Sequence, residues 1–353
     1  MLGTSAGGVG THVRLLAGAL VRSGARVAVL GPASTEELHD FTGTGASFAP
    51  VEIHNGPRPV ADSTALIRLR TLLRRADVVH AHGLRAGLLA GLATSKPLVV
   101  TWHNAVLAAG PLGRLYALLE RVVARRADLV LAVSPDLEER VRTLGGRDVR
   151  PGPVAAPPLP RPGRTPVAVR AELGAADRPL LVTVARLHPQ KGYRTLVEAA
   201  AQLADRVPPP LFVAAGDGPQ RAELDALIAE TRAPVKLLGR RSDVSDLLAA
   251  ADVVVLPSVW EGSPLAAQEA LRAGKPFIGT LAGGVPALVG DAGDLVPPED
   301  PDALAAAVCR VLDDADHAAA LVARGRARLD QLPTPESVFG QVSAVYTELM
   351  GAG

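Results

Sequence analysis

Short apolar runs rich in Val, Leu and Ala alternate along the chain with segments whose apolar residues recur every three or four positions. The first pattern is typical of buried strands and the second of amphipathic helices. In the first half we predict strands over residues 25–31, 76–83, 97–103 and 127–134, and helices over segments such as 11–24 and 113–126. This alternation predicts an α/β domain with a mainly parallel sheet.

Prolines interrupt the alternation in the segment RPGPVAAPPLPRPGRTP, residues 150–166. Because proline lacks a backbone donor, the segment predicts a linker between domains. The alternation then resumes, with strands expected over residues 179–187, 210–218, 235–240, 251–258 and 276–281. We therefore expect a first domain over residues 1–150, a linker over 151–166, a second domain over 167–333, and a C-terminal helix over 334–353 that returns to the first domain.

Length and composition agree with two ordinary domains and limit the function classes. The chain has 353 residues, and its 37 Lys and Arg nearly balance 36 Asp and Glu. No net field therefore attracts nucleic acid. Cys309 is the only cysteine, which excludes an intramolecular disulfide. Because no apolar run reaches the length of a transmembrane helix and no signal peptide is recognisable, we expect a cytoplasmic protein.

The stretch WEGSPLAAQEALRAGKP, residues 260–276, contains two glutamates without a nearby cation between them. Ser263 suits an N-cap and Pro264 the first helical position, so Glu261 is expected in the loop and Glu269 on the second helical turn. Two carboxylates at one helix entrance could accept hydrogen bonds from the hydroxyls of a nucleotide sugar. The alternative is that Glu261 only favours the helix N-terminus and that Glu269 is solvated or ion-paired.

The segment VARLHPQKG follows a predicted strand and places Arg186 and Lys191 in one loop. A guanidinium and an ammonium together suit a diphosphate, although two solvated loop cations remain the alternative.

A glycine-rich segment, GTSAGGVGTHV, precedes a helix expected to begin near Thr11. Amides at a helix N-terminus can bind phosphate. The segment is not a P-loop, which would need Lys at Val9, nor a dinucleotide fingerprint, which would need Gly at Val13. A tight turn needed only for packing is the alternative.

Several motifs in a fixed order carry a family resemblance: GTSAGGVGTHV, DVVHAHG, TWHN, VARLHPQKG, GDGPQRAEL, LPSVWEGSPLAAQEALRAGKPFIGT and LAGGVP. The chain resembles glycosyltransferase family 4, whose members are retaining enzymes with the GT-B architecture. The resemblance covers nearly the whole chain. It implies an α/β protein of two Rossmann-like domains that face each other across a cleft.

The resemblance also implies roles for individual residues. Donor diphosphate binding is implied for Arg186, Lys191, Gly8 and Gly10, and binding of the transferred sugar for Glu261, Gly262, Ser263 and Pro264. Glu269 would bind the ribose, and the backbone near Gly239 and Arg240 would contact the base. His103 and Glu261 would act at the reacting sugar, although His103 could instead be a structural loop residue. His80 and His82 are expected to be packing residues and not a metal pair.

The implied activity is transfer of a sugar, of the hexosyl or N-acetylhexosaminyl type, from a nucleoside-diphosphate sugar with retention of configuration. The acceptor would be a sugar, a cyclitol, a lipid or another small molecule, and no metal or other cofactor is expected for catalysis. Two alternatives stay open: a nucleotide-sugar epimerase of the same fold, and a non-catalytic nucleotide-sugar-binding protein.

The helix expected over residues 113–126 combines an apolar stripe with Arg114, Arg121, Arg125 and Arg126. This pattern could place the protein peripherally on the cytoplasmic face of an anionic membrane. We prefer the alternative that the apolar stripe faces the core and that the basic face is solvated.

Only Met1 and Leu2 precede the glycine-rich segment, which is shorter than an average strand of about 5 residues. In an α/β unit such a segment follows the first strand. We therefore expect an apolar, strand-forming segment upstream of Met1 in the natural protein, and a first domain that is less stable than the second.

Overall fold

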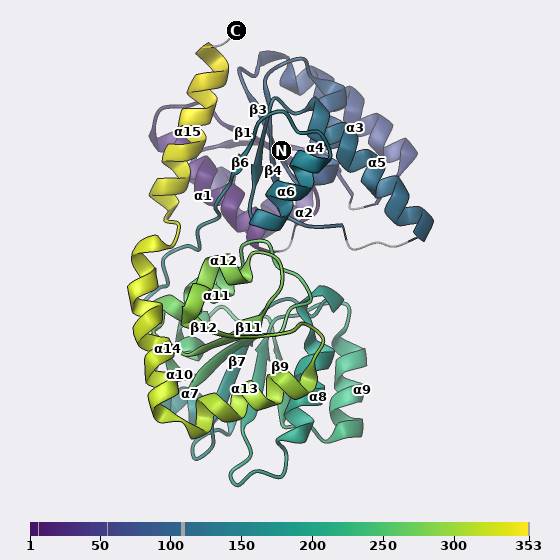
Figure 1. Cartoon of the computed structure of the whole chain (residues 1–353). Helices are drawn as coiled ribbons and strands as arrows, with labels where there is room; N and C mark the ends of the chain where they lie inside the picture. Colours follow the sequence, from purple (N-terminus) through teal and green to yellow (C-terminus); the bar gives the residue numbers. More distant parts are fainter. Residues whose placement is uncertain (6, 55, 107–109, 352–353) are drawn as a thin grey trace. The chain divides into compact units, whose positions relative to one another are not determined.

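The computed structural model describes residues 1–353 except 6, 55, 107–109 and 352–353 (Figure 1). The chain divides into two compact units, unit 1 (Met1–Pro157 and Pro333–Gly353) and unit 2 (Pro158–Leu332). Each unit is a parallel α/β domain of the Rossmann type, in agreement with the predicted fold class. The C-terminal helix α15 (Pro335–Gly351) belongs to unit 1, as expected.

Unit 1 contains two parallel ladders, β1-β2 and β3-β4-β5-β6. The strands are β1 (Ala28–Gly31), β2 (Ser47–Pro50), β3 (Val79–His82), β4 (Leu98–Trp102), β5 (Leu129–Ala132) and β6 (Val149–Pro151). Four of them lie within strands that the apolar runs predicted. The central strands β3, β4 and β5 are buried along their whole length, which explains their continuous apolar sequence.

Met1 and Leu2 lie between the two ladders. The Leu2 amide donates to Leu30 O at 3.0 Å, and the His82 amide donates to Met1 O at 2.8 Å. Leu2 is fully buried and forms a parallel bridge with His82. These two residues therefore satisfy backbone groups of both neighbouring strands.

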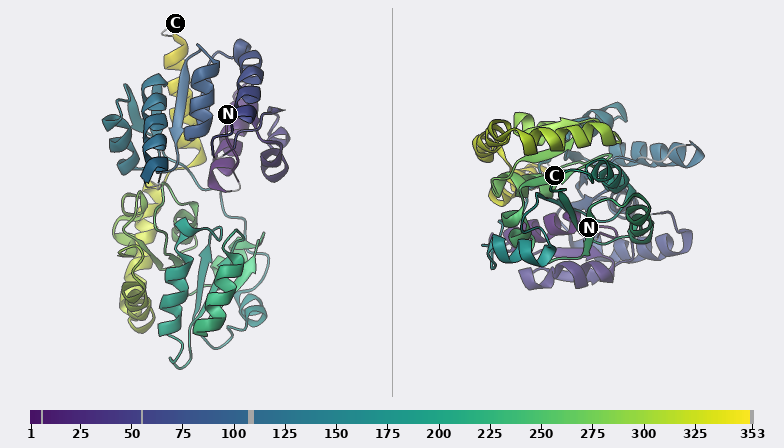
Figure 2. Two further views of the ribbon diagram at one scale, coloured as in Figure 1. Left: turned by 90° about the vertical axis from the view of Figure 1, so that its right-hand side faces the viewer. Right: turned by 90° about the horizontal axis from the view of Figure 1, so that it is seen from below.

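The helices of unit 1 connect and cover its strands (Figure 2). They are α1 (Gly8–Arg22), α2 (Ala33–His39), α3 (Pro59–Leu72), α4 (Leu84–Ala93), α5 (Gly110–Arg126), α6 (Pro135–Thr143) and α15. Helices α1 and α15 share a hydrophobic cluster with the sheet, to which Leu16, Val99 and Val342 contribute. The two ends of the chain are thus packed into one core.

The first part of the expected linker belongs to the packed body of unit 1. Pro151 ends the edge strand β6, where a proline is tolerated because one side of the strand needs no ladder partner. Val154, Ala155 and Ala156 are then buried. The boundary between the units falls after Pro157, inside the proline-rich segment.

Helix α5 is oriented differently from the preferred sequence-based interpretation. Its buried residues are Glu120, Val123 and Ala124, and Glu120 accepts a hydrogen bond from Arg140 Nε at 3.0 Å. Four other apolar residues of the helix are exposed instead: Leu112, Leu115, Leu118 and Val122. The prediction that the apolar stripe as a whole faces the core is wrong, because Val123, Ala124 and a paired glutamate form the packed face.

Unit 2 has one six-stranded parallel sheet with the order β12-β11-β10-β7-β8-β9. The strands are β7 (Leu180–Val184), β8 (Leu211–Ala215), β9 (Val235–Gly239), β10 (Val253–Leu256), β11 (Phe277–Thr280) and β12 (Gly293–Val296). Two hydrophobic clusters, one containing Phe212 and the other Phe277, pack the helices against the sheet. Strand order brings the carboxyl ends of β11, β10, β7 and β8 together at one edge of the sheet.

The helices of unit 2 follow the strands in the predicted alternation (Figures 1 and 2). They are α7 (Pro166–Leu173), α8 (Tyr193–Gln202), α9 (Arg221–Thr231), α10 (Val244–Ala250), α11 (Leu265–Arg272), α12 (Val285–Val289), α13 (Pro301–Asp313) and α14 (Ala315–Arg328).

Candidate active site

Loops at the carboxyl ends of β7, β8 and β10 approach one another closely in unit 2. A Cβ on Gly192 would lie 1.8 Å from Pro257 O, and one on Gly216 would lie 1.8 Å from Ala185 O. Gly192 also has a φ of +66°, in the left-handed region. Only glycine fits at these positions, so the loops are held at a separation that a side chain would increase.

An ion pair connects the loops after β7 and β10. Lys191 Nζ lies 2.6 Å from Glu261 Oε1, and Ser258 Oγ donates to the same oxygen at 2.7 Å. Glu261 is buried, with its side chain 8% exposed. The Val259 amide donates to Gln190 O at 2.9 Å, which fixes the two loops in register. The sequence predicted both charged residues but not their pairing, and it missed Ser258 and Gln190.

Arg186 differs from Lys191 in its surroundings. It is exposed and forms no ion pair or hydrogen bond with any residue that the structure describes. Burial, then the charges of Arg186 and Lys191, lower the pKa of His188 below its usual value. The loop therefore presents two cations beside a neutral imidazole, an arrangement that can bind an anion.

Glu269 lies on the second turn of α11, as predicted. The helix begins at Leu265 with Pro264 as its N-cap, so the expected Ser263 cap is displaced by one residue. Burial raises the pKa of Glu269, and the nearby Arg272 only partly opposes this effect. Glu269 is therefore a carboxylate that is costly to ionise and has capacity to accept hydrogen bonds from a ligand. Gly262, which directly follows Glu261 and precedes the helix, is also buried.

Gly239 ends β9 and Arg240 follows it, at the same edge of the sheet. The Gly216 amide donates to Gly239 O at 2.8 Å, and Gly239 has a φ of +71°. Arg240 is exposed. The structure thus brings the predicted base-binding backbone beside the loop after β8, within the same unit as the two cations and both glutamates.

The glycine-rich loop lies in unit 1, where helix α1 begins at Gly8 and not near Thr11. Gly8 is exposed, whereas the Gly10 amide donates to Ser5 Oγ at 3.1 Å. A Cβ on Gly10 would lie 2.1 Å from the His39 ring. Gly10 therefore has a packing role, which leaves the amide end near Gly8 as the accessible part of this loop.

His103, directly after β4, belongs to a buried group of histidines in unit 1. Its Nε2 lies 3.1 Å from His82 Nδ1, and both rings lie 5.4 Å from the His12 ring, centroid to centroid. Burial lowers the pKa of His12 to about 4 and those of His82 and His103 well below their usual value. All three imidazoles are therefore neutral at pH 7. The sequence missed His12, whose helical position gave no signal by itself.

His80 is packed beside this group, as predicted. Its Nδ1 lies 2.7 Å from Tyr346 Oη of α15, and its Nε2 lies 2.6 Å from Thr101 Oγ1. Its ring stacks on that of His82 at 4.2 Å. His80 thus connects the C-terminal helix to the histidine group.

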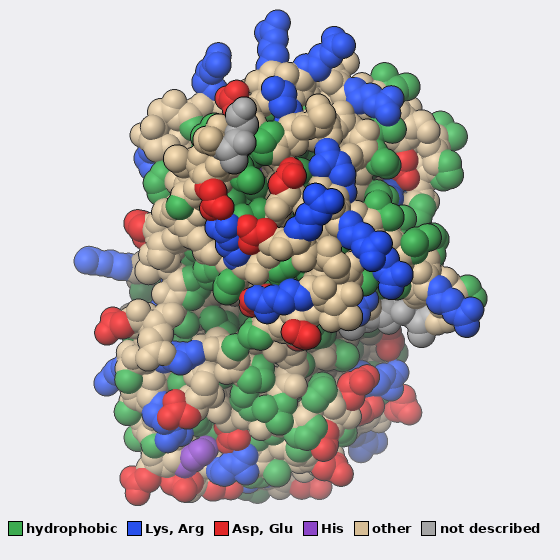
Figure 3. Space-filling model, turned by 45° about the horizontal axis from the view of Figure 1, so that its top comes forward, with side chains coloured by type: hydrophobic (Ala, Val, Ile, Leu, Met, Phe, Trp, Pro, Cys, Tyr) green, Lys and Arg blue, Asp and Glu red, His purple; other side chains and the backbone are tan. Residues whose placement is uncertain are grey.

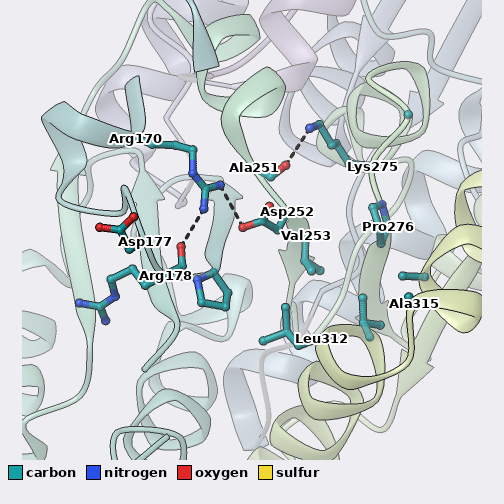
Figure 4. Close-up of a pocket in the computed structure, with 14 residues that line it drawn as sticks. Arg170, Asp177, Arg178, Ala251, Asp252, Val253, Lys275, Pro276, Leu312 and Ala315 are labelled. Atoms are coloured by element: carbon teal, nitrogen blue, oxygen red, sulfur yellow. Dashed lines mark hydrogen bonds and ion pairs between the residues drawn. The ribbon is translucent and has the colours of Figure 1, made fainter. Parts of the chain in front are cut away.

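A separate pocket lies at the opposite, amino-terminal edge of the unit 2 sheet (Figure 4). Its three cations are already bonded within the protein: Arg170 to Asp252 and Ala250 O, Arg178 to Pro209 O and Pro210 O, and Lys275 to Ala249 O and Ala251 O. These contacts tie helices to strand starts and leave the pocket without a free positive charge, so it is not the predicted anion site.

Comparisons with known families agree with this arrangement. A family model described as a glycosyl transferase 4-like domain matches residues 7–159, and one described as glycosyl transferases group 1 matches residues 178–314. The first covers most of unit 1 without its C-terminal helix, and the second covers the strands and loops that carry Arg186, Lys191 and both glutamates.

Curated relatives match over most of their length. A D-inositol 3-phosphate glycosyltransferase of Xylanimonas cellulosilytica is 31% identical, with 91% of this chain and 87% of the relative covered. A phosphatidyl-myo-inositol mannosyltransferase of Mycolicibacterium smegmatis is 29% identical, with 98% and 92% covered.

Solved structures share the fold. HepE from Anabaena, crystallised in complex with UDP, matches with a TM-score of 0.81 at 22% identity, and 98% of each chain is covered. Sucrose-phosphate synthase from Thermosynechococcus elongatus matches with a TM-score of 0.81 at 24% identity, covering 100% of this chain and 99% of that one. The fold, the family models and the curated relatives together show that the chain belongs to the family 4 glycosyltransferases of GT-B architecture.

Proposed function

We propose that this glycosyltransferase moves a sugar from a nucleoside-diphosphate sugar to an acceptor hydroxyl with retention of configuration. One observation carries the proposal: the buried Glu261 carboxylate, bonded to Lys191 and Ser258, lies at the carboxyl edge of the unit 2 sheet, in the unit that also carries the unpaired Arg186. Such an edge is where doubly wound sheets bind nucleotides.

Stabilisation of the leaving nucleoside diphosphate is assigned to Arg186 and Lys191. Charge develops on the diphosphate as the glycosidic bond breaks, and fixed cations stabilise it without reorganisation. Arg186 can donate two parallel hydrogen bonds, and Lys191 acts as a compact charge. With these two groups in place, we propose that catalysis requires no metal ion.

Glu261 and Glu269 are assigned to hydroxyls at opposite ends of the donor. Glu261 would accept hydrogen bonds from the transferred sugar, supported by the adjoining backbone of Gly262, Ser263 and Pro264. Glu269 would accept hydrogen bonds from the ribose, and the backbone near Gly239 and Arg240 would contact the base. Hydrogen bonds from the donor would then offset the desolvation of the Glu269 carboxylate. Lys191 would interact with both Glu261 and the phosphates.

In unit 1 we assign His103 to the transferred sugar and the Gly8 end of α1 to the phosphates or the acceptor. The neutral state of His103 suits hydrogen bonding to hydroxyls and does not require it to carry a charge. Since two curated relatives are named for inositol-containing acceptors, cyclitols and their phosphorylated or lipid-linked derivatives are the first acceptors to test.

The test is release of nucleoside diphosphate, followed over a panel of nucleotide sugars with and without acceptors. Acceptor-dependent release and a product with the donor's anomeric configuration by NMR would support retaining transfer. Formation of an epimeric nucleotide sugar without acceptor would identify an epimerase instead. A donor that raises the melting temperature but is never consumed would favour the binding-protein alternative.

A second proposal concerns peripheral membrane contact through α5. We propose that its exposed residues Leu112, Leu115, Leu118 and Val122 insert at the surface of an anionic membrane, on the cytoplasmic face. Arg114, Arg121 and Arg125 are exposed on the same helix and supply charge complementary to anionic lipids. Figure 3 shows hydrophobic side chains interspersed with Lys and Arg on the face drawn there. None of the helices in the described part of the chain combines the length and the apolar character of a membrane span.

Flotation with vesicles tests this contact. The protein should float with phosphatidylglycerol vesicles and not with phosphatidylcholine vesicles, and Leu115→Glu with Leu118→Glu should abolish flotation. Val167→Glu is the matched control, since Val167 is an exposed apolar residue on α7 of unit 2. Equal flotation of both variants would refute the proposal.

A further inference from the structure

Three imidazoles from three separate elements of unit 1 converge on one buried point. His12 comes from α1, His82 ends β3, and His103 follows β4. Each of the three offers a ring nitrogen within 4.8 Å of those of the other two, and the side chains belong to residues that are 4%, 5% and 7% exposed. Among the described residues this is the one group of three or more potential ligands that lies this close.

Hydrogen bonding separates these three histidines from His80. Both ring nitrogens of His80 are engaged, by Tyr346 and Thr101. In contrast, the rings of His82 and His103 hydrogen-bond only each other, and the His12 ring makes no hydrogen bond to any residue that the structure describes. Three ring nitrogens are thus available to a common ligand, while His80 stacks on His82 and holds its ring in place.

The distances are close to those of a transition-metal site. Bonds of about 2.1 Å in a tetrahedral arrangement place two ligand nitrogens about 3.4 Å apart. His82 Nδ1 and His103 Nε2 are separated by 3.1 Å, and the widest separation in the group is at most 4.8 Å. A modest rotation of the rings would therefore bring all three nitrogens to one ion.

We propose that His12, His82 and His103 form a binding site for a divalent transition-metal ion of the zinc, cobalt or nickel type. Imidazole ligands select these ions over magnesium and calcium, which prefer oxygen. The three rings are already neutral and need lose no proton on binding. Three protein ligands leave a fourth position open to water, hydroxide or an anion, which can balance the positive charge in this buried place.

The site has a consequence for activity that rests on the proposed role of His103. An ion bound to the His103 nitrogen prevents that nitrogen from hydrogen bonding to the transferred sugar. Metal binding therefore inhibits transfer instead of supporting it. This metal site does not conflict with the metal-independent reaction proposed above, because the bound ion is an inhibitor and not a cofactor.

Titration of the chelator-treated, full-length protein with Co²⁺ tests the site directly, without donor or acceptor. We expect one equivalent to bind and to produce the visible absorption of cobalt in a tetrahedral nitrogen environment, which one equivalent of Zn²⁺ should then remove. His12→Gln should weaken Zn²⁺ binding at least about 10-fold, because it deletes a direct ligand. His54→Gln is the matched control, because His54 belongs to unit 1 but not to the buried histidine group, and it should retain the cobalt spectrum.

Absence of stoichiometric Co²⁺ and Zn²⁺ binding to the folded wild-type protein would overturn the proposal, as would equal binding by wild type and His12→Gln. Circular dichroism confirms that the variants are folded, and His82→Gln provides a second ligand deletion if His12→Gln does not fold. Failure of metal binding leaves the transfer reaction untouched. Conversely, binding without inhibition would keep the site and count against the role of His103.

Discussion

Unit 1 and unit 2 share one parallel α/β plan but place opposite chemistry at the carboxyl ends of their strands. In unit 1 the strand ends carry histidines that burial keeps neutral, such as His82 and His103. In unit 2 the corresponding edge carries the charged Lys191–Glu261 pair and an unpaired Arg186, and Glu269, whose pKa is raised by burial, lies on the following helix α11.

Under the proposed function, this difference divides the reaction between two tasks. Charges are useful where a diphosphate must be held and released, because only charged groups stabilise its developing charge strongly. Neutral imidazoles are useful where hydroxyls must be oriented without attracting a competing anion. The same contrast makes the two units respond differently to acid, to substitution and to ligands.

Acidification should produce the largest difference. The folded pKa values of the buried histidines lie below their unfolded value of about 6.5, so the unfolded state binds protons first. The contribution of these neutral histidines to the stability of unit 1 is therefore fully present above pH ~6.5 and is lost as the pH falls, on the order of 3 kcal/mol by pH ~4 from His12 alone.

The two tryptophans allow this to be measured, because Trp102 lies in β4 of unit 1 and Trp260 in unit 2. Chemical unfolding of the variants Trp260→Phe and Trp102→Phe, with a chelator present, reports each unit separately by fluorescence. Unit 1 should become the less stable unit at acid pH. A pH-independent difference between the two transitions would contradict the burial of neutral histidines.

Lys191→Ala should reduce kcat/KM by about 100-fold, or about 2.7 kcal/mol, because it removes the fixed positive charge that we assign to stabilising the leaving diphosphate. It also leaves Glu261 buried without its cation and should lower the stability of unit 2. Combining it with Glu261→Gln should restore stability but not activity, which separates the two effects. Arg194→Ala, an exposed arginine three residues further on, is the control and should keep full activity. If Lys191→Ala has the same kcat/KM as the wild type, the proposed donor site is wrong.

His103→Ala should lower kcat about 10-fold, or about 1.4 kcal/mol, while the affinity for free nucleoside diphosphate stays unchanged. The reason is that His103 is assigned to the sugar and lies in unit 1, whereas Arg186 and Lys191, which are assigned to the phosphates, lie in unit 2. Kinetics with a chelator, together with calorimetric titration of the nucleotide, measure the two quantities. His54→Ala, a histidine of unit 1 outside the buried group, serves as the control. A parallel loss of nucleotide affinity would mean that unit 1 also holds the phosphates through His103.

Glu269→Gln should change stability less than the changes above, and it should stabilise unit 2 slightly instead of destabilising it. Since burial raises the pKa of Glu269, the folded protein holds its proton more tightly than the unfolded chain, and unit 2 loses stability as pH rises above ~4.5. The neutral amide removes this cost, so the melting temperature of unit 2 at pH 7 should rise slightly while nucleoside binding weakens. Calorimetry without and with nucleotide tests both. A lower melting temperature would show that the carboxylate stabilises the fold.

Much of this molecule follows from local sequence patterns. Apolar runs predicted most of the strands, because a buried parallel strand needs continuous apolar residues whatever its neighbours are. The position of Glu269 on a helical turn and the placement of Lys191 after a strand depended on the same local rules. The helix start was shifted from the expected Pro264 to Leu265 because capping depends on backbone angles that a residue type only favours.

Tertiary structure alone decided which of these residues meet. Lys191 and Glu261 are 70 positions apart and pair because β7 lies beside β10 in the sheet. His12, His82 and His103 converge because α1, β3 and β4 pack together, although no spacing in the sequence connects them. The exposed leucines of α5 show the same limit: an amphipathic pattern determines that a helix has two faces, but only packing decides which face is buried.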